Sequence, residues 1–476
     1  MNFSELFPFI FILNFLVLII LVCFERRDPV VSLAWVLGFT ALPVVGFVIF
    51  LIFGRGLKKK TKDKYVQKWN MNIDLTEKLK RDEELRALSE HTLGGEYGDI
   101  MLYLLNTNNS IYTDDNSVQI FTDATDKYIT LLSDIRNAKK SINMLYFIIR
   151  DDDISKKVIN ALAKKAEEGV EVRVLYDDFG SLLTSKHIFK PLISAGGRVY
   201  SFFPLKSSYT KINHRNHRKI VVIDNEIGYT GGMNIGDEYM GKKKPSPWRD
   251  THIRLSGGSV TYLQKIFSLD WLFATGENMS ENLHKFFTPP LKKYGDTGVQ
   301  IVASGPDSDA EEIKCGMIKM ISHAKERIYI QTPYFVPDSA FLTAITIAAQ
   351  SGVDVYVMIP GIPDKKYVYY STYSFLGELL EAGAKVYKYP GFLHAKTLVV
   401  DDRIATIGTS NLDIRSFQLH FEVNAFIYGE ETAQAAGRAF RKDMQICHRI
   451  TDEEYKKRGV WQQMKEGFFR LFSPIM

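Results

Sequence analysis

The sequence predicts an α/β protein of two similar tandem domains, related by pseudo-twofold symmetry and preceded by two transmembrane helices. Three observations predict this fold class: two long uncharged segments near the start, alternating strand and helix patterns from about residue 118, and short sequence phrases that occur twice. Of the 476 residues, 46% are hydrophobic and 24% are charged, which is ordinary for a chain with a real core. Dominant disorder, collagen and coiled coil are therefore excluded.

The first apolar segment runs from Phe7 to Phe24 and the second from Val30 to Phe53, and neither contains a charged residue. Each is long enough to cross roughly 30 Å of hydrocarbon as a helix. Arg55 and a group of lysines follow the second segment, so the positive-inside rule places the basic side and the large C-terminal region in the cytoplasm. A buried soluble hairpin is the alternative. The basic group is a topology signal, or it also holds anionic lipid headgroups.

Alternating strands and helices begin after a charged linker. Ser141 to Ile149 is predicted to be a strand, Ser155 to Glu168 a helix that Gly169 ends, and Val170 to Tyr176 a second strand. This spacing is typical of a βαβ unit. The domains that we predict are a membrane anchor (1–60), a polar helical linker (61–117), a first α/β domain (118–295), a second (296–450) and an amphipathic C-terminal tail (451–476).

The two α/β domains are predicted from an internal repeat. The phrase at 118–120 returns at 299–301, and that at 169–172 returns at 352–355 with one conservative change. A repeat of this length indicates a duplicated domain, because solenoid repeats run about 20 to 50 residues. Two similar domains that pack symmetrically would bring equivalent loops together at one shared cleft.

Each half ends in the same chemical element, His-x-Lys-x4-Asp, followed by a Gly and then an Asn. Its predicted catalytic residues are His217, Lys219 and Asp224 in the first half and His394, Lys396 and Asp401 in the second, with Asn234 and Asn411 predicted to bind phosphate. Two matches in the register of the repeat exceed what chance provides for ten histidines.

The spacing favours phosphodiester chemistry. A His and a Lys two residues apart on a strand project from the same face. Two ammonium groups and two amides can bind the nonbridging oxygens and stabilise charge in the transition state. One imidazole can attack phosphorus, while the other protonates the leaving alkoxide. Asp224 and Asp401 either orient side chains or cap the following turn. We predict no metal and no cofactor, since neither a two-metal carboxylate cluster nor a Cys/His cluster is evident.

The paired elements resemble the HKD motifs of the phospholipase D superfamily over residues 118–476, and five segments resemble bacterial cardiolipin synthases more closely: 216–219, 228–239, 248–252, 332–338 and 391–396. The resemblance implies that two phosphatidylglycerols give cardiolipin and glycerol through a phosphatidyl-histidine, at the bacterial cell membrane. The implied partners are phosphatidylglycerol and anionic membrane lipids, and no nucleic acid. Either histidine can attack; we favour His217.

The resemblance also implies an acid downstream of each element that orients an imidazole, and Asp250 and Glu422 stand at suitable places. A surface salt bridge is the alternative for each. Gly232 departs from the family pattern, because many members carry Ser or Thr there, as Thr409 does in the second half. This departure indicates that the two halves are not chemically equivalent.

Three other functions remain open at the level of sequence: a hydrolytic phospholipase D, a nuclease on the same fold, and a noncatalytic lipid-binding scaffold. Two membrane segments and the lack of a long Arg-rich tract argue against a nuclease. Intact His, Lys and Asn residues in both halves argue against a scaffold. The segment from Trp461 to Phe472 mixes aromatic and charged residues, so it either lies at the membrane interface or packs on the catalytic domain.

Overall fold

The computed structural model describes residues 95–205, 213–242, 247–279, 292–308 and 310–475, together with some of the first 50 residues, including helix α2 (Pro29–Ala41). Most of the first predicted transmembrane segment and residues 61–94 of the predicted linker lie outside the described residues. Helix α2 begins one residue before the second predicted segment and covers its first part. In the part of the chain that the structure describes, we find no helix with the length and apolarity that crossing a membrane requires.

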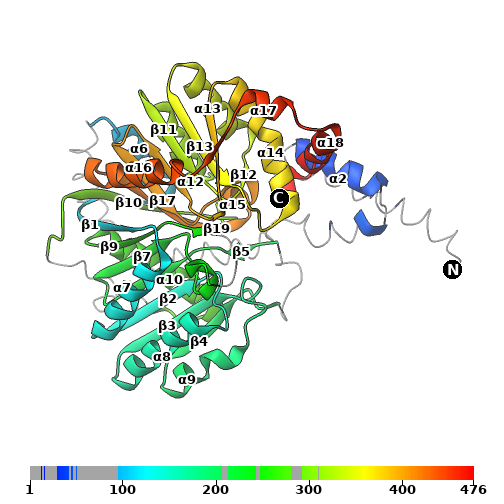
Figure 1. Cartoon of the computed structure of the whole chain (residues 1–476). Coiled ribbons are helices and arrows are strands. Elements are labelled where there is room, and N and C mark those ends of the chain that lie inside the picture. The colour runs from blue at the N-terminus through cyan, green and yellow to red at the C-terminus, as the bar shows by residue number, and fades with distance from the viewer. Residues whose placement is uncertain are drawn as a thin grey trace, which may run out of the picture.

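The first half forms a twisted sheet covered by helices (Figure 1). Its strands are β1 (Thr113–Phe121), β2 (Ser141–Tyr146), β3 (Glu171–Asp177), β4 (Arg198–Phe202), β5 (Arg215–Asn216), β6 (Ile220–Ile223), β7 (Ile227–Gly231), β8 (Trp248–Arg249) and β9 (His252–Ser256). Its helices are α7 (Ala124–Asn137), α8 (Asp153–Glu167), α9 (Lys190–Ser194) and α10 (Ser259–Thr275), and α6 (Gly98–Asn108) precedes them.

The second half repeats this plan. Its strands are β10 (Thr297–Ser304), β11 (Arg327–Gln331), β12 (Phe335–Val336), β13 (Asp354–Pro360), β14 (Lys385–Tyr389), β15 (Phe392–Leu393), β16 (Thr397–Val400), β17 (Ile404–Gly408), β18 (Leu412–Asp413), β19 (His420–Tyr428) and β20 (His448–Ile450). Its helices are α12 (Glu312–Ser322), α13 (Ser339–Gln350), α14 (Lys366–Glu381), α15 (Ile414–Gln418), α16 (Glu430–Met444), α17 (Asp452–Lys456) and α18 (Val460–Arg470).

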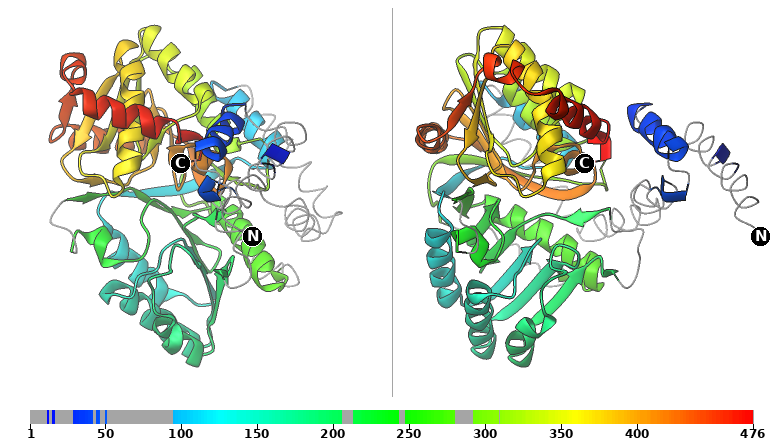
Figure 2. Two further views of the ribbon diagram at one scale, coloured as in Figure 1. Left: turned by 90° about the vertical axis from the view of Figure 1, so that its right-hand side faces the viewer. Right: turned by 45° about the vertical axis from the view of Figure 1, so that its right-hand side comes forward.

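Most strands of both halves join into one continuous sheet, while β12 pairs with β18 and β15 with β8 in two small separate sheets. The order of the continuous sheet is β20-β14-β13-β11-β16-β17-β19-β10-β1-β9-β7-β6-β2-β3-β4, and β1 and β10 pair antiparallel at the centre. Read inward from its two ends, and leaving out β20, the sheet has equivalent strands of the two halves in the same order: β14-β13-β11-β16-β17-β19-β10 and β4-β3-β2-β6-β7-β9-β1. The predicted α/β class and the duplication are therefore confirmed, and the two halves stack one above the other in Figure 2.

Local sequence explains the elements that carry the site. Strands β2 and β6 are buried along their whole length. β6 is a continuous apolar run, as is typical of a strand covered on both faces, whereas β2 also buries Ser141 and Asn143. Helix α8 begins where the Asp152 side chain accepts the Ser155 N–H, and it ends before Gly169, which adopts a φ of +88°. A core that includes Trp271 from the first half and Phe421 from the second joins the domains, which fixes their motif elements relative to each other.

The two motif aspartates tie neighbouring parts of each domain together. Asp224 follows β6 with a φ of 56°, and its carboxylate accepts the backbone N–H groups of residues 139–141 at 2.7–2.9 Å. Asp401 follows β16 with a φ of 53° and accepts those of residues 325–327 at 2.7–2.9 Å. Asp tolerates the left-handed region better than most residues do. Each aspartate thus fixes the turn that leads into β2 or β11.

We predict that Asp401→Ala destabilises the protein. Three backbone N–H groups lose their acceptor, so the free energy of unfolding should fall by about 1–2 kcal/mol, as it does when a helix N-cap is lost. The measurement is thermal unfolding followed by circular dichroism. Asp354→Ala is the control, because Asp354 makes an exposed ion pair with Lys385 and such pairs contribute little. Equal melting temperatures for the two variants would contradict this role.

Candidate active site

Each motif histidine enters the site on a short strand that pairs with the opposite half. His217 follows β5, which pairs parallel with β19, and its backbone N–H donates to the Phe421 carbonyl at 2.9 Å. His394 follows β15, which pairs parallel with β8, and its N–H donates to the Arg249 carbonyl at 2.6 Å. The backbone therefore fixes each histidine against the other domain.

The two imidazoles are also held crosswise by acids. His217 Nδ1 lies 2.9 and 3.0 Å from the two carboxyl oxygens of Glu422, which is on β19 of the second half. His394 Nδ1 lies 2.6 Å from Asp250 Oδ2, which follows β8 of the first half. The structure thus brings both predicted orienting acids to the imidazoles, each to the one in the other half. Hydrogen bonding at Nδ1 directs Nε2 toward substrate.

Both histidines and both motif asparagines line one cavity of about 840 Å³. The Asn234 side-chain oxygen accepts the Ile148 N–H at 3.1 Å, and its amide donates to the Tyr239 hydroxyl. The Asn411 side-chain oxygen has no hydrogen-bond partner among the described residues. The structure brings these four predicted residues together, as a shared cleft requires.

The motif lysines are buried beside the histidines. Lys219 Nζ donates to the His217 carbonyl at 2.6 Å, and Lys396 Nζ donates to that of His394. Burial lowers the pKa of Lys219 to about 7 and that of Lys396 to about 8, while nearby acids raise both values. Charges held in such a dry site act on a bound phosphate far more strongly than they would in water.

The motif aspartates do not belong to the cleft. We predicted catalytic positions for Asp224 and Asp401, but neither lines the cavity, and both carboxylates are occupied by backbone N–H groups. The physical reason is the strand length: four residues of buried strand carry each aspartate to the end of the strand away from its histidine. Their place in the structure indicates a structural role.

Burial lowers the pKa of both imidazoles. It lowers the pKa of His217 well below its usual value, and Lys219 lowers it further. Burial and Lys396 lower the pKa of His394, while Asp250 opposes the shift. Burial raises the pKa of Glu422 to about 8, against the effect of Lys219. His217 is thus the more firmly neutral imidazole, and His394 is the one whose partner favours protonation.

The two halves differ where the sequence indicated. Thr409 Oγ1 donates to Glu422 Oε2 at 2.5 Å and so supports the acid that holds His217. At Gly232, a Cβ atom would stand 2.0 Å from Asp250 Oδ1, so a side chain there would displace the acid that holds His394. The departure from the family pattern therefore matches a different placement of the acid in each half.

Sequence reasoning missed several residues of the cleft. His420 stands two residues before Glu422 on β19, and its ring centroid lies 5.8 Å from that of His217. Trp248 and Phe392 surround His394 at 5.9 and 5.8 Å. Trp248 and Phe392 lie within the segments 248–252 and 391–396, and His420 stands close to Glu422, so the sequence carried a signal for all three. Phe468, Phe469 and Phe472 of the C-terminal segment also line the cleft, and nothing in the sequence pattern indicated that.

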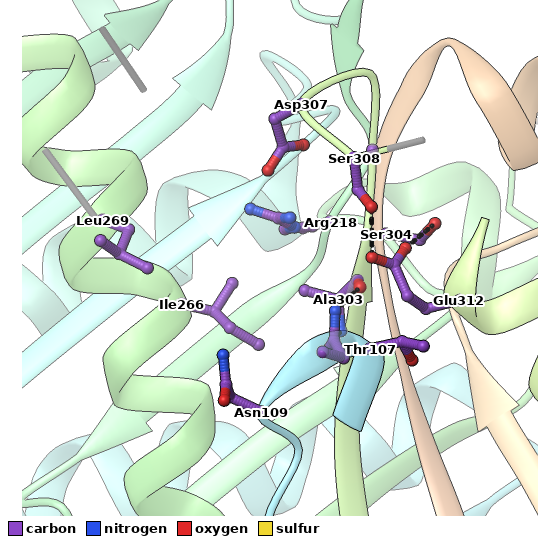
Figure 3. A pocket seen from close by; sticks show the side chains of 12 residues that line it. Thr107, Asn109, Arg218, Ile266, Leu269, Ala303, Ser304, Asp307, Ser308 and Glu312 are labelled. Carbon is purple, nitrogen blue, oxygen red and sulfur yellow. Dashed lines mark hydrogen bonds between the residues drawn. The ribbon is translucent and has the colours of Figure 1, made fainter. Parts of the chain in front are cut away.

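A second cavity, of about 230 Å³, contains neither histidine (Figure 3). Arg218 reaches this cavity, because successive residues of an extended chain point to opposite sides. Its guanidinium is paired with buried Asp270 at 2.8 Å. The wall also includes Glu312, which accepts hydrogen bonds from Ser304 and Ser308. Arg218 and Glu312 therefore have partners, and we assign no chemistry to this cavity. Among the described residues, no group of three or more His, Cys, Asp or Glu is arranged to hold a metal ion.

Comparison with known families agrees with the motifs. Residues 131–267 and 317–444 match the family model described as cardiolipin synthase, PLD-like domain, and each segment contains one motif element. Residues 12–55 match the model for the phospholipase D-nuclease N-terminal region.

Similar proteins cover nearly the whole chain. The major cardiolipin synthase ClsA of Bacillus subtilis is 46% identical over 99% of both chains. Cardiolipin synthase 2 of Staphylococcus epidermidis is 44% identical over 98% of this chain and 96% of that protein. The crystal structure of phosphatidylserine synthase from Haemophilus influenzae has a TM-score of 0.60 at 16% identity, covering 79% of this chain and 100% of that one. This last likeness concerns the fold alone.

We predict that Gly232→Ala slows phosphodiester turnover. The added methyl group collides with Asp250 Oδ1, so the acid must move away from His394, and a displacement of about 1 Å can cost about 10² in rate. The measurement is the steady-state rate of phosphodiester transfer. Gly459→Ala is the matched control, because a Cβ there meets nothing within 4 Å. An unchanged rate in Gly232→Ala would show that the Asp250 contact with His394 is dispensable.

Proposed function

This chain belongs to the cardiolipin synthases of the phospholipase D superfamily, and we propose that its cleft joins two phosphatidylglycerols into cardiolipin with release of glycerol. The enzyme is a phosphatidyltransferase. The observation that carries the proposal is the pair of imidazoles in one cleft, each held through Nδ1 by a buried acid of the opposite half. That arrangement can supply a nucleophile on one side of a phosphate and an acid–base group on the other side.

In the first step, His217 Nε2 attacks the phosphorus of one phosphatidylglycerol. A P–N bond forms, and the P–O bond to the headgroup glycerol breaks. His394, protonated through Nε2, gives its proton to the departing glycerol oxygen. Asp250 and the anionic phosphate favour the protonated imidazole. We assign the attack to His217 because burial and Lys219 keep this ring neutral most firmly.

In the second step, the terminal hydroxyl of another phosphatidylglycerol attacks the phosphatidyl-histidine. His394, now neutral, takes the hydroxyl proton while the P–N bond breaks and the new P–O bond forms. Cardiolipin leaves and His217 is free again. Protons and charges therefore return to their starting positions after each cycle. The reaction is reversible because the whole cycle exchanges one phosphodiester bond for another.

Four polar side chains support the transition state. Lys219 and Lys396 supply positive charge to the nonbridging oxygens, and Asn234 and Asn411 supply amide groups at the cavity wall. The roles of these four residues, and of Asp250 and Glu422 as orienting acids, are part of the proposal. No step requires a metal or an organic cofactor.

The substrate places the enzyme at a membrane. Phosphatidylglycerol stays in the bilayer, so we propose that residues 1–60 anchor the protein in the bacterial cell membrane through two helices, with the catalytic domains in the cytoplasm. The match of residues 12–55 to an N-terminal family model supports a dedicated segment there. A linker (61–117), catalytic domains (118–295 and 296–450) and a tail (451–476) complete the proposed organisation.

Product analysis tests the transfer reaction against hydrolysis. The full chain is reconstituted in phosphatidylglycerol vesicles with EDTA present, and lipids and glycerol are quantified. We expect cardiolipin and glycerol in equal amounts, because one glycerol leaves for each transfer. Phosphatidic acid as the main product would identify water as the acceptor, and loss of activity in EDTA would contradict the cofactor-free mechanism.

A second experiment distinguishes the two histidines. With phosphatidyl-nitrophenol the leaving group needs no proton, so the first step depends on the nucleophile alone. We expect His394→Ala to release a burst of about one nitrophenol per enzyme and then to stall, because nothing activates the acceptor. His217→Ala should give no burst. The reverse pattern would make His394 the nucleophile, and no burst in either variant would remove the covalent step.

A further inference from the structure

The C-terminal helix α18 packs with its polar side inward. Glu466 is 3% exposed, forms an ion pair with Arg458 at 2.9 Å, and accepts a hydrogen bond from Gln462 at 3.0 Å. Arg470 donates to the Ser374 carbonyl of α14 at 2.9 Å and pairs with Glu378. Phe469 stacks on Tyr370 of α14 at 5.8 Å. Polar contacts and one aromatic stack therefore hold the helix on the protein.

Its apolar side faces outward. Six large apolar side chains of the segment are between 38% and 76% exposed, and we call them the outer stripe: Val460, Trp461, Met464, Phe468, Leu471 and Phe472. Spacings of three and four residues place the first four on one face of the helix, opposite Glu466, and Leu471 and Phe472 follow directly after the helix ends. A helix docked only to complete the fold would bury this face. A contiguous apolar patch left in contact with water marks an interaction site.

The outer stripe is continuous with the catalytic cleft. Phe468 and Phe472 belong to the stripe and also line the cavity that holds His217 and His394. A phospholipid whose phosphate lies at the histidines must direct its acyl chains out of the cavity. These two rings offer the chains an apolar exit, because acyl chains that leave along them do not pass through water.

The outer stripe also lies near the N-terminal segment. Helix α2 contacts the last turn of the chain, η6 (Ser473–Ile475), directly after the stripe, and Figures 1 and 2 show α2 and α18 beside each other. The described part of α2 contains no charged residue. Tryptophan and phenylalanine, with Lys465 exposed beside them, are the residues that an interfacial helix uses at a lipid surface.

We infer that the outer stripe of α18 inserts into the phospholipid bilayer and holds the mouth of the cleft at the membrane, so that the acyl chains of the substrate pass along Phe468 and Phe472. This inference rests on the proposed function, because it requires a lipid substrate. The anchor then keeps the enzyme at the membrane, while α18 sets the orientation of its cleft. The occupant is the bilayer, and not a second copy of the chain.

A triple variant tests the surface without touching the cleft. Trp461→Ser/Met464→Ser/Leu471→Ser removes three stripe residues that do not line the cavity. We expect cardiolipin formation in reconstituted phosphatidylglycerol vesicles to fall by about tenfold or more, since each removed side chain stabilises insertion. With dihexanoyl phosphatidylglycerol dispersed as monomers, activity should stay within about twofold of wild type.

Two equally exposed isoleucines provide the matched control. Ile129 on α7 is 62% exposed and Ile347 on α13 is 57% exposed, and Ile129→Ser/Ile347→Ser should leave both activities unchanged. Equal losses on vesicles and monomers in the triple variant would overturn the inference, as would full activity on vesicles. If wild type makes cardiolipin from neither the vesicles nor the monomers, the proposed function itself fails, and this outcome is distinct from failure of the inference.

Fluorescence locates Trp461 directly. In a Trp35→Phe background, which removes the tryptophan of the proposed anchor, we expect lipids brominated on their acyl chains to quench the protein more than they quench the same protein with Trp461→Phe, because Trp461 is the remaining tryptophan that the inference places in the hydrocarbon. Equal quenching would contradict insertion. Efficient disulfide cross-linking of Met464→Cys between two chains would assign the stripe to a dimer contact and overturn the membrane role.

Discussion

The site depends on one interaction, the hydrogen bond between each imidazole and an acid of the opposite half. Glu422 reaches His217 and Asp250 reaches His394, and the short strand pairs β5–β19 and β8–β15 place the backbones that make this possible. Neither domain supplies the acid that holds its own histidine. The central pairing of β1 with β10 and the shared core around Trp271 and Phe421 therefore have a catalytic as well as a structural consequence.

The buried charges of the site are balanced against one another. Burial raises the pKa of Glu422 to about 8 and lowers that of Lys219 to about 7, so the pKa values of this acid and this base lie close together. An anionic phosphate entering such a site favours protonated lysines and draws protons toward itself. The substrate thus completes the electrostatics of the cleft, and a neutral ligand of the same shape would not.

The sequence was sufficient for the α/β class and the duplication, because a repeated pattern of fixed spacing records them locally. The same pattern led to His217 and His394, which the structure brings to one cleft, and to Lys219 and Lys396, which lie buried beside them; the catalytic roles of these residues stay predictions. It was not sufficient for contacts between distant segments. The crosswise choice of acid depends on how two domains pack, and the placement of Asp224 depends on where a strand ends. The inside-out packing of α18 could not be foreseen, since an amphipathic pattern shows which residues share a face and not which face meets the protein.

The crosswise acids have a consequence for how such a chain can arise and change. A single unduplicated copy would carry one imidazole and one acid, and the acid would be placed to hold the imidazole of a second copy. Such a chain would therefore become an enzyme only as a symmetric pair of identical chains. In a symmetric pair, one sequence must suit both histidine sites. After fusion of two copies, the residues around each histidine can change independently. Gly232 and Thr409 occupy equivalent places with incompatible side-chain requirements. Such specialisation is possible only after the two copies have become separate parts of one gene.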